Sequence, residues 1–287
     1  MIGWYDSFEH VKQKLLVWVA RQDQEDYLKT RGYLGALAIG LPIIYLPERH
    51  IRRIQGSLLV MPAHSINETT QSWNIASYLR TIYDVRDRFS DIVVCLHASC
   101  WGKDNVRRAF QDGPFPVIQG AGGEVNALHR MQQLLSTFEY VTSNSSGSHM
   151  AYGAFFGAKV SIFGKYAELS KADLQNHITY KKYPWRLALD LASGSEQNTL
   201  KHFPFLFGLP WEVKQQIEWG REQVGYASRK NPEELKKLFG WAIHRRVFKL
   251  ALVRRAAGRL YGFTRAQAQR LRPCIARHLN VGVEAKP

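Results

Sequence analysis

Short polar segments follow five apolar runs in the middle of the chain, and their residue types suit the binding of an anion. In chain order these segments are residues 62–65, 97–99, 119–123, 143–148 and 164–166. Imidazoles can donate to a phosphate or act as bases, and hydroxyls and exposed backbone N–H groups bind phosphate oxygens. If the five runs are strands of one parallel sheet, all five segments lie at its ligand-binding edge.

The serine-rich segment is the strongest of the five. Its hydroxyls and N–H groups stand where a helix is expected to begin, and the positive end of a helix dipole favours phosphate. Small residues follow, so this helix can lie close to the sheet. The alternative interpretation is an ordinary serine-rich helix cap. The phosphate-binding candidates are Ser143, Asn144, Ser145, Ser146, Gly147 and Ser148.

His64 and Ser65 directly follow an apolar run, and His64 is the candidate catalytic base or phosphate donor. Glu68 is the nearest carboxylate and is the second catalytic candidate, either as a base or by orienting His64. His97 is expected to face the same cleft. The alternatives are a His64 that bonds only to backbone, a Glu68 on a solvated face and a His97 outside the cleft.

The glycine-rich segment allows a ligand to approach the backbone closely, which makes Gly120, Gly122 and Gly123 candidate nucleotide-binding residues. Lys165 could add positive charge, or it could be a surface lysine. The glycine spacing does not match a dinucleotide fingerprint, and the sequence has no P-loop lysine motif. His129 and His149 fall inside expected helices, where we interpret them as packing residues.

The elements that must position these residues alternate between strand and helix. Such alternation predicts βαβ units, a parallel sheet and helices on both of its faces. A helix at 7–31 and a buried strand at 40–47 precede this region, and helix starts are expected at Pro210 and at Asn231. The expected strands are 57–61, 91–96, 115–118, 140–142 and 159–163, and the expected helices are 72–88, 104–111, 124–138 and 147–156.

The sequence therefore predicts an α/β protein with a Rossmann-like parallel sheet and helical extensions at both ends. The expected division is an N-terminal helical segment with a short strand (1–55), a nucleotide-sugar-binding domain (56–170) and a basic, mainly helical region (171–287). With 287 residues and 45% hydrophobic content, the chain can bury a sizeable core.

Targeting signals and disulfides are not expected. No apolar run is long enough for a membrane span, and residues 1–6 do not resemble a secretory signal. The three cysteines, Cys95, Cys100 and Cys274, form no CxxC pair, so we expect no zinc site and a reducing, cytoplasmic location.

Two stretches of the sequence, residues 58–65 (LLVMPAHS) and 138–164 (FEYVTSNSSGSHMAYGAFFGAKVSIFG), resemble the donor-binding half of GT-B glycosyltransferases. They are most similar to the bacterial sialyl-, polysialyl- and Kdo-transferase-like branch that acts in capsule and lipopolysaccharide synthesis. The resemblance implies that His64 and the pair Ser145 and Ser146 hold the phosphate of a nucleotide-sugar. It also implies a metal-independent transfer that needs no cofactor, with Glu68 or His64 as the base.

The resemblance implies a nucleotide-sugar donor and a glycan or lipid-linked acceptor as partners. The 56 residues before the sheet are fewer than a usual acceptor-binding half contains. The alternative is therefore a non-catalytic subunit that binds a sugar nucleotide or a glycan and requires a partner subunit.

The net charge of +15 is concentrated at the C-terminal end, where residues 241–287 hold eleven basic residues and one acidic residue. Basic and apolar residues alternate there in an amphipathic pattern, which favours peripheral binding to the anionic inner face of the cell membrane. A solvated helical face is one alternative. Nucleic-acid binding is a weaker one, because no nucleic-acid module is recognisable.

Overall fold

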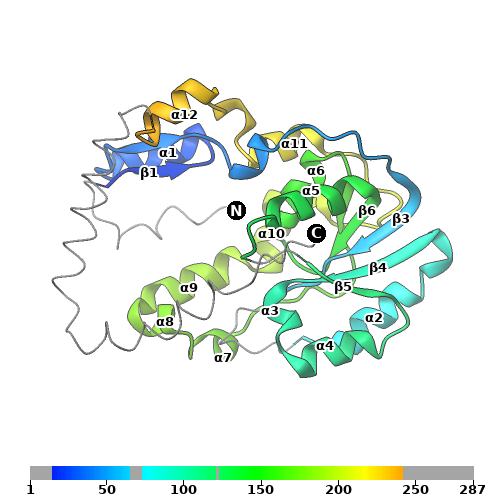
Figure 1. Ribbon diagram of the computed structural model, residues 1–287. Coiled ribbons are helices and arrows are strands. Elements are labelled where there is room, and N and C mark those ends of the chain that lie inside the picture. Colours follow the sequence, from blue (N-terminus) through cyan, green and yellow to red (C-terminus); the bar gives the residue numbers. More distant parts are fainter. Residues whose placement is uncertain (1–14, 65–72, 121–122, 242–287) are drawn as a thin grey trace, which may run out of the picture. The chain divides into compact units, whose positions relative to one another are not determined.

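The computed structural model describes residues 15–64, 73–120 and 123–241. The chain divides into two compact units, Met1–Arg229 and Lys230–Pro287. The five-stranded sheet belongs to the first unit (Figure 1). Residues of the same unit line both pockets described below. None of the helices within the described ranges is long and apolar enough to cross a membrane.

The centre of the first unit is a five-stranded sheet in the order β5-β4-β3-β6-β7, and every neighbouring pair of strands is parallel. The predicted α/β class with a Rossmann-like parallel sheet is thus confirmed. The strands are β3 (Ile54–Val60), β4 (Asp91–Leu96), β5 (Val117–Gln119), β6 (Phe138–Ser143) and β7 (Lys159–Ile162).

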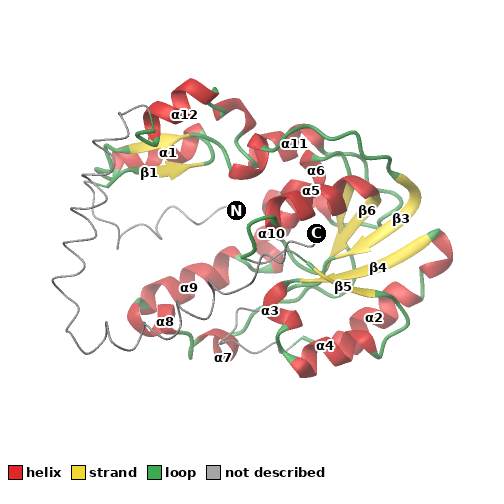
Figure 2. Cartoon of the chain, in the orientation of Figure 1, coloured by secondary structure: helices red, strands yellow, loops and turns green. Residues whose placement is uncertain are grey.

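Helices cover both faces of this sheet, as the crossover rule requires (Figure 2). Side chains alternate along each strand, so Leu59 packs in one core cluster while Leu58 and Val60 pack in the other. All three are fully buried, which explains why residues 58–60 form an unbroken apolar run.

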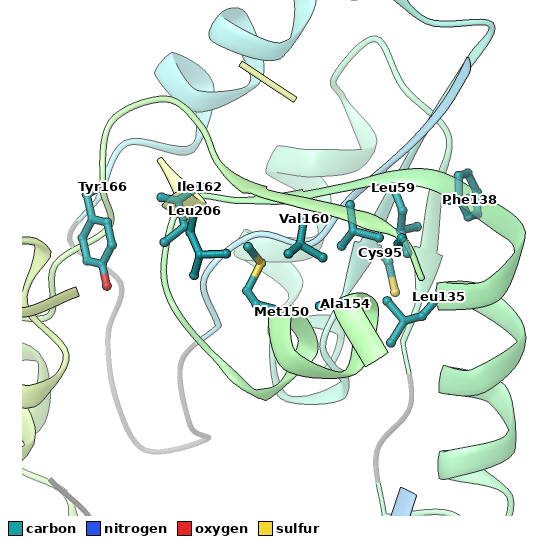
Figure 3. Packing of buried hydrophobic residues seen from close by; sticks show 12 residues of the cluster. Leu59, Cys95, Leu135, Phe138, Met150, Ala154, Val160, Ile162, Tyr166 and Leu206 are labelled. Atoms are coloured by element: carbon teal, nitrogen blue, oxygen red, sulfur yellow. The ribbon is translucent and has the colours of Figure 1, made fainter. Parts of the chain in front are cut away.

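The first face is covered by α5 (Ala127–Thr137) and α6 (Ser148–Phe155). Figure 3 shows this layer, in which Met150 and Ala154 of α6 lie against the strand residue Val160. The second face is covered by α2 (Ile75–Tyr83), the short α3 (Ala98–Trp101) and α4 (Asp104–Gln111).

The N-terminal region differs from the prediction. Residues 7–31 do not form one helix: within the described part, β1 (Val17–Val19) precedes α1 (Gln22–Thr30), and β2 (Ala36–Ala38) pairs with β1 in parallel. Val17 and Val19 are buried while Trp18 is more exposed, the alternation of a strand. The strand expected at 40–47 is also wrong, because Gly40 has φ +75 and a 3-10 helix, η2 (Pro42–Tyr45), begins with proline.

The C-terminal part of the first unit consists of short helices and returns to the N-terminal strands. The helix expected to begin at Pro210 is wrong; residues 210–216 contain turns and irregular backbone, and α11 begins at Ile217. The helices after the sheet are α7 (Lys171–Leu174), α8 (Ile178–Lys182), α9 (Pro184–Ser193), α10 (Glu196–His202) and α11 (Ile217–Gln223), with 3-10 turns at η4 (Pro204–Leu206) and η5 (Tyr226–Ser228). A further 3-10 turn, η3 (Arg86–Arg88), lies between α2 and β4.

Two glycines permit the close packing of α11. A β-carbon at Gly220 would lie 2.3 Å from the backbone nitrogen of Phe155 in α6, so only glycine fits there. Gly225 has φ +69, and a β-carbon on it would lie 1.9 Å from the carbonyl oxygen of Ala20. The Leu41 N–H also donates to the Val224 carbonyl at 2.9 Å, which ties this end of the unit to the N-terminal segment.

In the second unit, α12 (Pro232–Leu238) begins as the sequence predicts. The Asn231 side chain accepts from the Glu234 N–H, and the Glu234 carboxylate accepts from the Asn231 N–H, with Pro232 in the first turn. The basic stretch after residue 241, on which the membrane prediction rests, lies outside the described residues.

Candidate functional site

The loops that follow β3 and β6 are held together by one buried residue, Asn144. Asn144 follows β6 and is 1% exposed, and its Oδ1 accepts from the backbone N–H of Ala63 at 2.8 Å. Its carbonyl oxygen accepts from the N–H of Ala167, which follows β7, at 2.7 Å. Asn144 therefore fixes the loop that carries His64 against the loop that carries Ser145.

Two predicted histidines meet at this edge. The rings of His64, after β3, and His97, after β4, stack with centroids 4.1 Å apart and an interplanar angle of 18°. Nδ1 of His97 accepts from the backbone N–H of Ser99 at 3.2 Å, so a neutral His97 carries its proton on Nε2. Burial lowers the pKa of His97, which favours this neutral form.

The serine-rich loop leads into α6 with extended backbone at Gly147, which precedes the helix and provides no side-chain cap. The N–H groups at the start of α6 therefore donate to no capping side chain, as an anion site requires. The Ser145 N–H donates to the Ser143 hydroxyl at 3.2 Å, which shapes the loop from within.

Two adjacent pockets open at this edge of the sheet. The serine pocket has a volume of about 170 Å³, and its lining includes His64, Trp73, Ser145, Ser146, Gly147, His149, Tyr166, Glu168, Asp190, Gly194 and Ser195. The methionine pocket has a volume of about 200 Å³, and its lining includes Met61, His64, Cys95, His97, Gly120, Leu128, Met131, Ser148, His149 and Tyr152.

His64 and His149 line both pockets and therefore form a shared wall. The expectation that His149 is a packing residue is wrong, because it is the second residue of α6 and faces the site. Its Nε2 is buried and has no hydrogen-bond partner in the described structure. Burial, reinforced by His64 and His97, lowers the pKa of His149 to about 3, so the ring is neutral at pH 7.

The other predicted site residues fall into three groups. Gly120 and Ser148 line the methionine pocket, while Ser65, Glu68 and Gly122 lie outside the described residues. The remaining four do not line either pocket: Ser143 and Asn144 are buried and shape the loop, and Gly123 and Lys165 are exposed. A side chain at position 120 would be crowded by the backbone, since a β-carbon there would lie 3.0 Å from the Leu96 carbonyl oxygen.

Several pocket residues were not predicted from the sequence. Trp73 precedes α2, and its indole Nε1 is buried without a partner in the described structure. Tyr166 and Glu168 follow β7, and Asp190 and Ser195 come from α9 and the turn after it. The sequence pattern does indicate Tyr166, because this residue belongs to the short segment 164–166 that follows the fifth expected strand.

The far wall of the serine pocket contributes two carboxylates. One oxygen of Asp190 accepts from the Tyr180 hydroxyl at 3.0 Å and from Nε of Arg186 at 3.1 Å. Oε1 of Glu168 accepts from the backbone N–H of Glu196 at 2.9 Å. The serine pocket thus has N–H, hydroxyl and imidazole donors on one side and carboxylate acceptors on the other.

Together, the sheet and this edge define an α/β protein with a Rossmann-like sheet and a pocketed site at the carboxyl ends of its strands. No protein-family model and no curated protein matches the chain. Among solved structures, the chain is similar to one described as the crystal structure of the GtfA/B complex, with 13% identity and a TM-score of 0.33. The similarity covers 74% of this chain and 42% of that chain, so this chain spans less than half of its length.

Proposed function

We propose that the protein is a glycosyltransferase of the GT-B type that binds a nucleotide-sugar at the carboxyl edge of the sheet. One observation carries the proposal: His64, Ser145, Ser146 and the start of α6 line the same pocket. These residues come from loops that are about 80 positions apart in the sequence, and they are the residues on which the family resemblance rests.

The phosphate of the donor fits the start of α6. The uncapped N–H groups at the start of α6, the Ser145 hydroxyl and an imidazole of the His64–His149 wall all supply hydrogen-bond donors. The buried and unpartnered Nε2 of His149 is a polar atom for which a bound ligand would provide the missing partner.

The two pockets differ in a way that suits the two ends of a nucleotide-sugar. Met61, Leu128 and Met131 give the methionine pocket apolar walls, and Tyr152 adds a ring, so this pocket suits a flat nucleobase. The carboxylates of Glu168 and Asp190 make the serine pocket suitable for sugar hydroxyls. In this arrangement the phosphate lies beside His64 and His149, between the nucleobase in the methionine pocket and the sugar in the serine pocket.

In the proposed reaction, the bond between the anomeric carbon and the phosphate oxygen breaks, and its electron pair stays on the phosphate. Donors at Ser145, His64 and the helix start stabilise this developing charge. The acceptor hydroxyl oxygen forms the new bond to the anomeric carbon and loses its proton to a base. His64 is the base candidate within the described residues, and Glu68 is the second candidate from the sequence.

The finer assignment follows the resemblance: transfer to a surface polysaccharide such as capsule or lipopolysaccharide, or to a lipid-linked acceptor. A lipid-linked acceptor fits a protein that binds peripherally to the inner face of the membrane. The basic residues after position 241 supply the charge for such binding.

A second candidate is a non-catalytic subunit that binds the sugar nucleotide and needs a partner chain. The observation that favours it is the two-stranded parallel sheet of β1 and β2, because parallel sheets are normally covered on both faces. Leu16 and Leu34 beside these strands are 70% and 80% exposed. Nucleotide binding without turnover would favour this candidate.

The test is a titration calorimetry series with CMP, UDP and GDP, followed by hydrolysis assays with the corresponding nucleotide-sugars. We expect one nucleotide to bind, and we expect His64→Ala to weaken that binding. His202→Ala, an exposed histidine at the end of α10, is the matched control and should bind as the wild type does. Absence of binding by all three nucleotides, or equal binding by the His64 variant, would contradict the proposal.

A further inference from the structure

A buried cluster of three hydroxyls lies behind the serine pocket; we name Ser146, Tyr166 and Thr199 the hydroxyl hub. Oη of Tyr166 lies 3.1 Å from Oγ of Ser146 and 3.0 Å from Oγ1 of Thr199. The two smaller hydroxyls, those of Ser146 and Thr199, are 3.3 Å apart. Tyr166 is 6% exposed and Thr199 is 3% exposed.

The protons of the hub can be assigned from its carbonyl neighbours. Tyr166 donates its hydroxyl proton to the Gly194 carbonyl at 3.1 Å, and Thr199 donates its own to the Ser195 carbonyl at 3.0 Å. Each hydroxyl has one proton, so neither residue has a second proton for Ser146. In this arrangement the Ser146 hydroxyl donates to Tyr166 or Thr199, and the contact between Tyr166 and Thr199 holds no proton.

The backbone of Ser146 is used in the same way, since its N–H donates to Oη of Tyr166 at 3.3 Å. Both donors of Ser146 are thus directed at the hub rather than into the pocket. Ser145 differs: its hydroxyl has no hydrogen-bond partner among the described residues, and it lines the serine pocket.

The hub joins two walls of that pocket. Ser146 belongs to the loop that enters α6, whereas Gly194 and Ser195 form the turn between α9 and α10, and all three line the pocket. Tyr166 follows β7 and bridges these two walls with one hydroxyl. Because the bridging atoms are buried, these hydrogen bonds are stronger than they would be in water.

We propose that the two neighbouring serines have divided roles: Ser145 donates to the bound ligand, and Ser146 is a positioning residue that Tyr166 and Thr199 hold in place. This division rests on the proposed function for its ligand, an anionic nucleotide. Thr199 then acts on ligand binding through the geometry of the loop. Tyr166 lines the serine pocket, but its hydroxyl is engaged in the hub and acts through the same loop.

The structure offers a matched pair of tyrosines for the test. Tyr166→Phe removes the hydroxyl that bridges the hub. Tyr78→Phe removes a hydroxyl that is also buried but has no hydrogen-bond partner in the described structure. Thr199→Val removes the second hub hydroxyl at nearly constant shape, and Ser145→Ala removes the ligand donor.

Two measurements are made on each variant of the full chain: calorimetric affinity for CMP, UDP and GDP, and amide hydrogen exchange of the ligand-free protein. We expect Ser145→Ala to weaken binding by about tenfold or more with normal exchange, because it removes one hydrogen bond to a charged group. Tyr166→Phe and Thr199→Val should weaken binding and also speed exchange in residues 145–148 and 194–199. Tyr78→Phe should change neither quantity.

The outcomes separate this inference from the proposed function. If Tyr166→Phe matches Tyr78→Phe in both measurements, or if Ser145→Ala speeds exchange as much as Tyr166→Phe does, the division of roles is wrong. If the wild-type protein binds none of the three nucleotides, the proposed function and the role of Ser145 both fail. In that case the exchange data still decide whether the hub holds the loop.

Discussion

The imidazole rings of His64 and His97 stack 4.1 Å apart, although the two residues follow different strands of the sheet. Burial lowers the pKa of His97, which favours the neutral form of that ring. The stack therefore places a neutral ring behind His64 and limits the orientations that His64 can adopt.

This relationship predicts that His97 supports nucleotide binding through its ring. His97→Ala should weaken the affinity for the bound nucleotide by about two- to tenfold, the size expected for the loss of one ring pair. His97→Phe retains a ring and should keep most of the affinity. Calorimetry on the two variants checks this. Equal weakening in both, or no weakening in either, would show that the stack does not position His64.

The second prediction concerns His149 and the pH dependence of stability. Its pKa in the folded protein is about 3, below the ordinary value of 6.5. Between these two values the unfolded chain binds a proton that the folded protein does not. The contribution of His149 is therefore fully present above about pH 6.5 and is lost as the pH falls.

His149→Gln removes this titration, so the stability of the variant should fall less than that of the wild type between pH 7 and pH 5. The difference in slope should approach about 1.4 kcal/mol per pH unit. Urea denaturation across this range measures it. Glu25 and Glu139, whose pKa values lie below 4.5, lose their contributions below the tested range. Parallel curves for the two proteins would contradict the assignment.

The third prediction concerns Arg53, at the edge of the sheet opposite the pockets. Its guanidinium donates to the carbonyl oxygens of Leu135, Phe138 and Phe156, which stand at the ends of α5 and α6. Arg53→Lys keeps the charge but loses the planar fork that reaches several carbonyls.

We expect Arg53→Lys to lower the free energy of unfolding by about 1–3 kcal/mol, because buried carbonyls lose their donor. Arg52→Lys changes the exposed neighbouring arginine and should have little effect. Urea denaturation of both variants provides the comparison. A loss of stability shared equally by both would mean that the three carbonyls do not depend on Arg53.

The fourth prediction separates backbone strain from steric overlap. Gly157 and Gly225 have φ values of +82 and +69, so alanine at either position carries the strain of the left-handed conformation, about 1–2 kcal/mol. At Gly157 an added β-carbon meets nothing closer than 3.7 Å. At Gly225 it would overlap the Ala20 carbonyl oxygen, so Gly225→Ala must move α11 or the N-terminal segment.

Gly225→Ala should therefore destabilise the protein clearly more than Gly157→Ala. Thermal denaturation compares their melting temperatures, and hydrogen exchange shows whether residues 17–41 become exposed. Similar melting temperatures for the two variants would mean that the close approach between Gly225 and Ala20 is relieved at little cost.

The sequence predicted the sheet well because the carboxyl-terminal residues of β3, β4, β6 and β7 are buried. A strand such as β3 has apolar neighbours on both faces, so it reads as a short apolar run, and polar residues follow it where the sheet ends. The same logic places His64 and Ser145 at one edge of the sheet from the sequence alone. Strand β1 escaped prediction, because three residues with one exposed position do not distinguish a strand from a helix face.

The far wall of the serine pocket could not be predicted, because it depends on contacts between distant parts of the chain. Nothing in the local pattern around Thr199 or Asp190 shows that they approach the loop after β6. His149 was misinterpreted for a different reason. A histidine inside a helix is usually a packing residue, but in the first turn of α6 the same side chain faces the site.

The most direct test of the central claim is the position of a nucleotide phosphate in crystals soaked with CMP, UDP or GDP. The proposed function predicts phosphate oxygens within about 3 Å of the Ser145 hydroxyl and of an imidazole nitrogen of His64, at the start of α6. A nucleotide bound at the sheet edge without these contacts, or bound elsewhere on the protein, would contradict it.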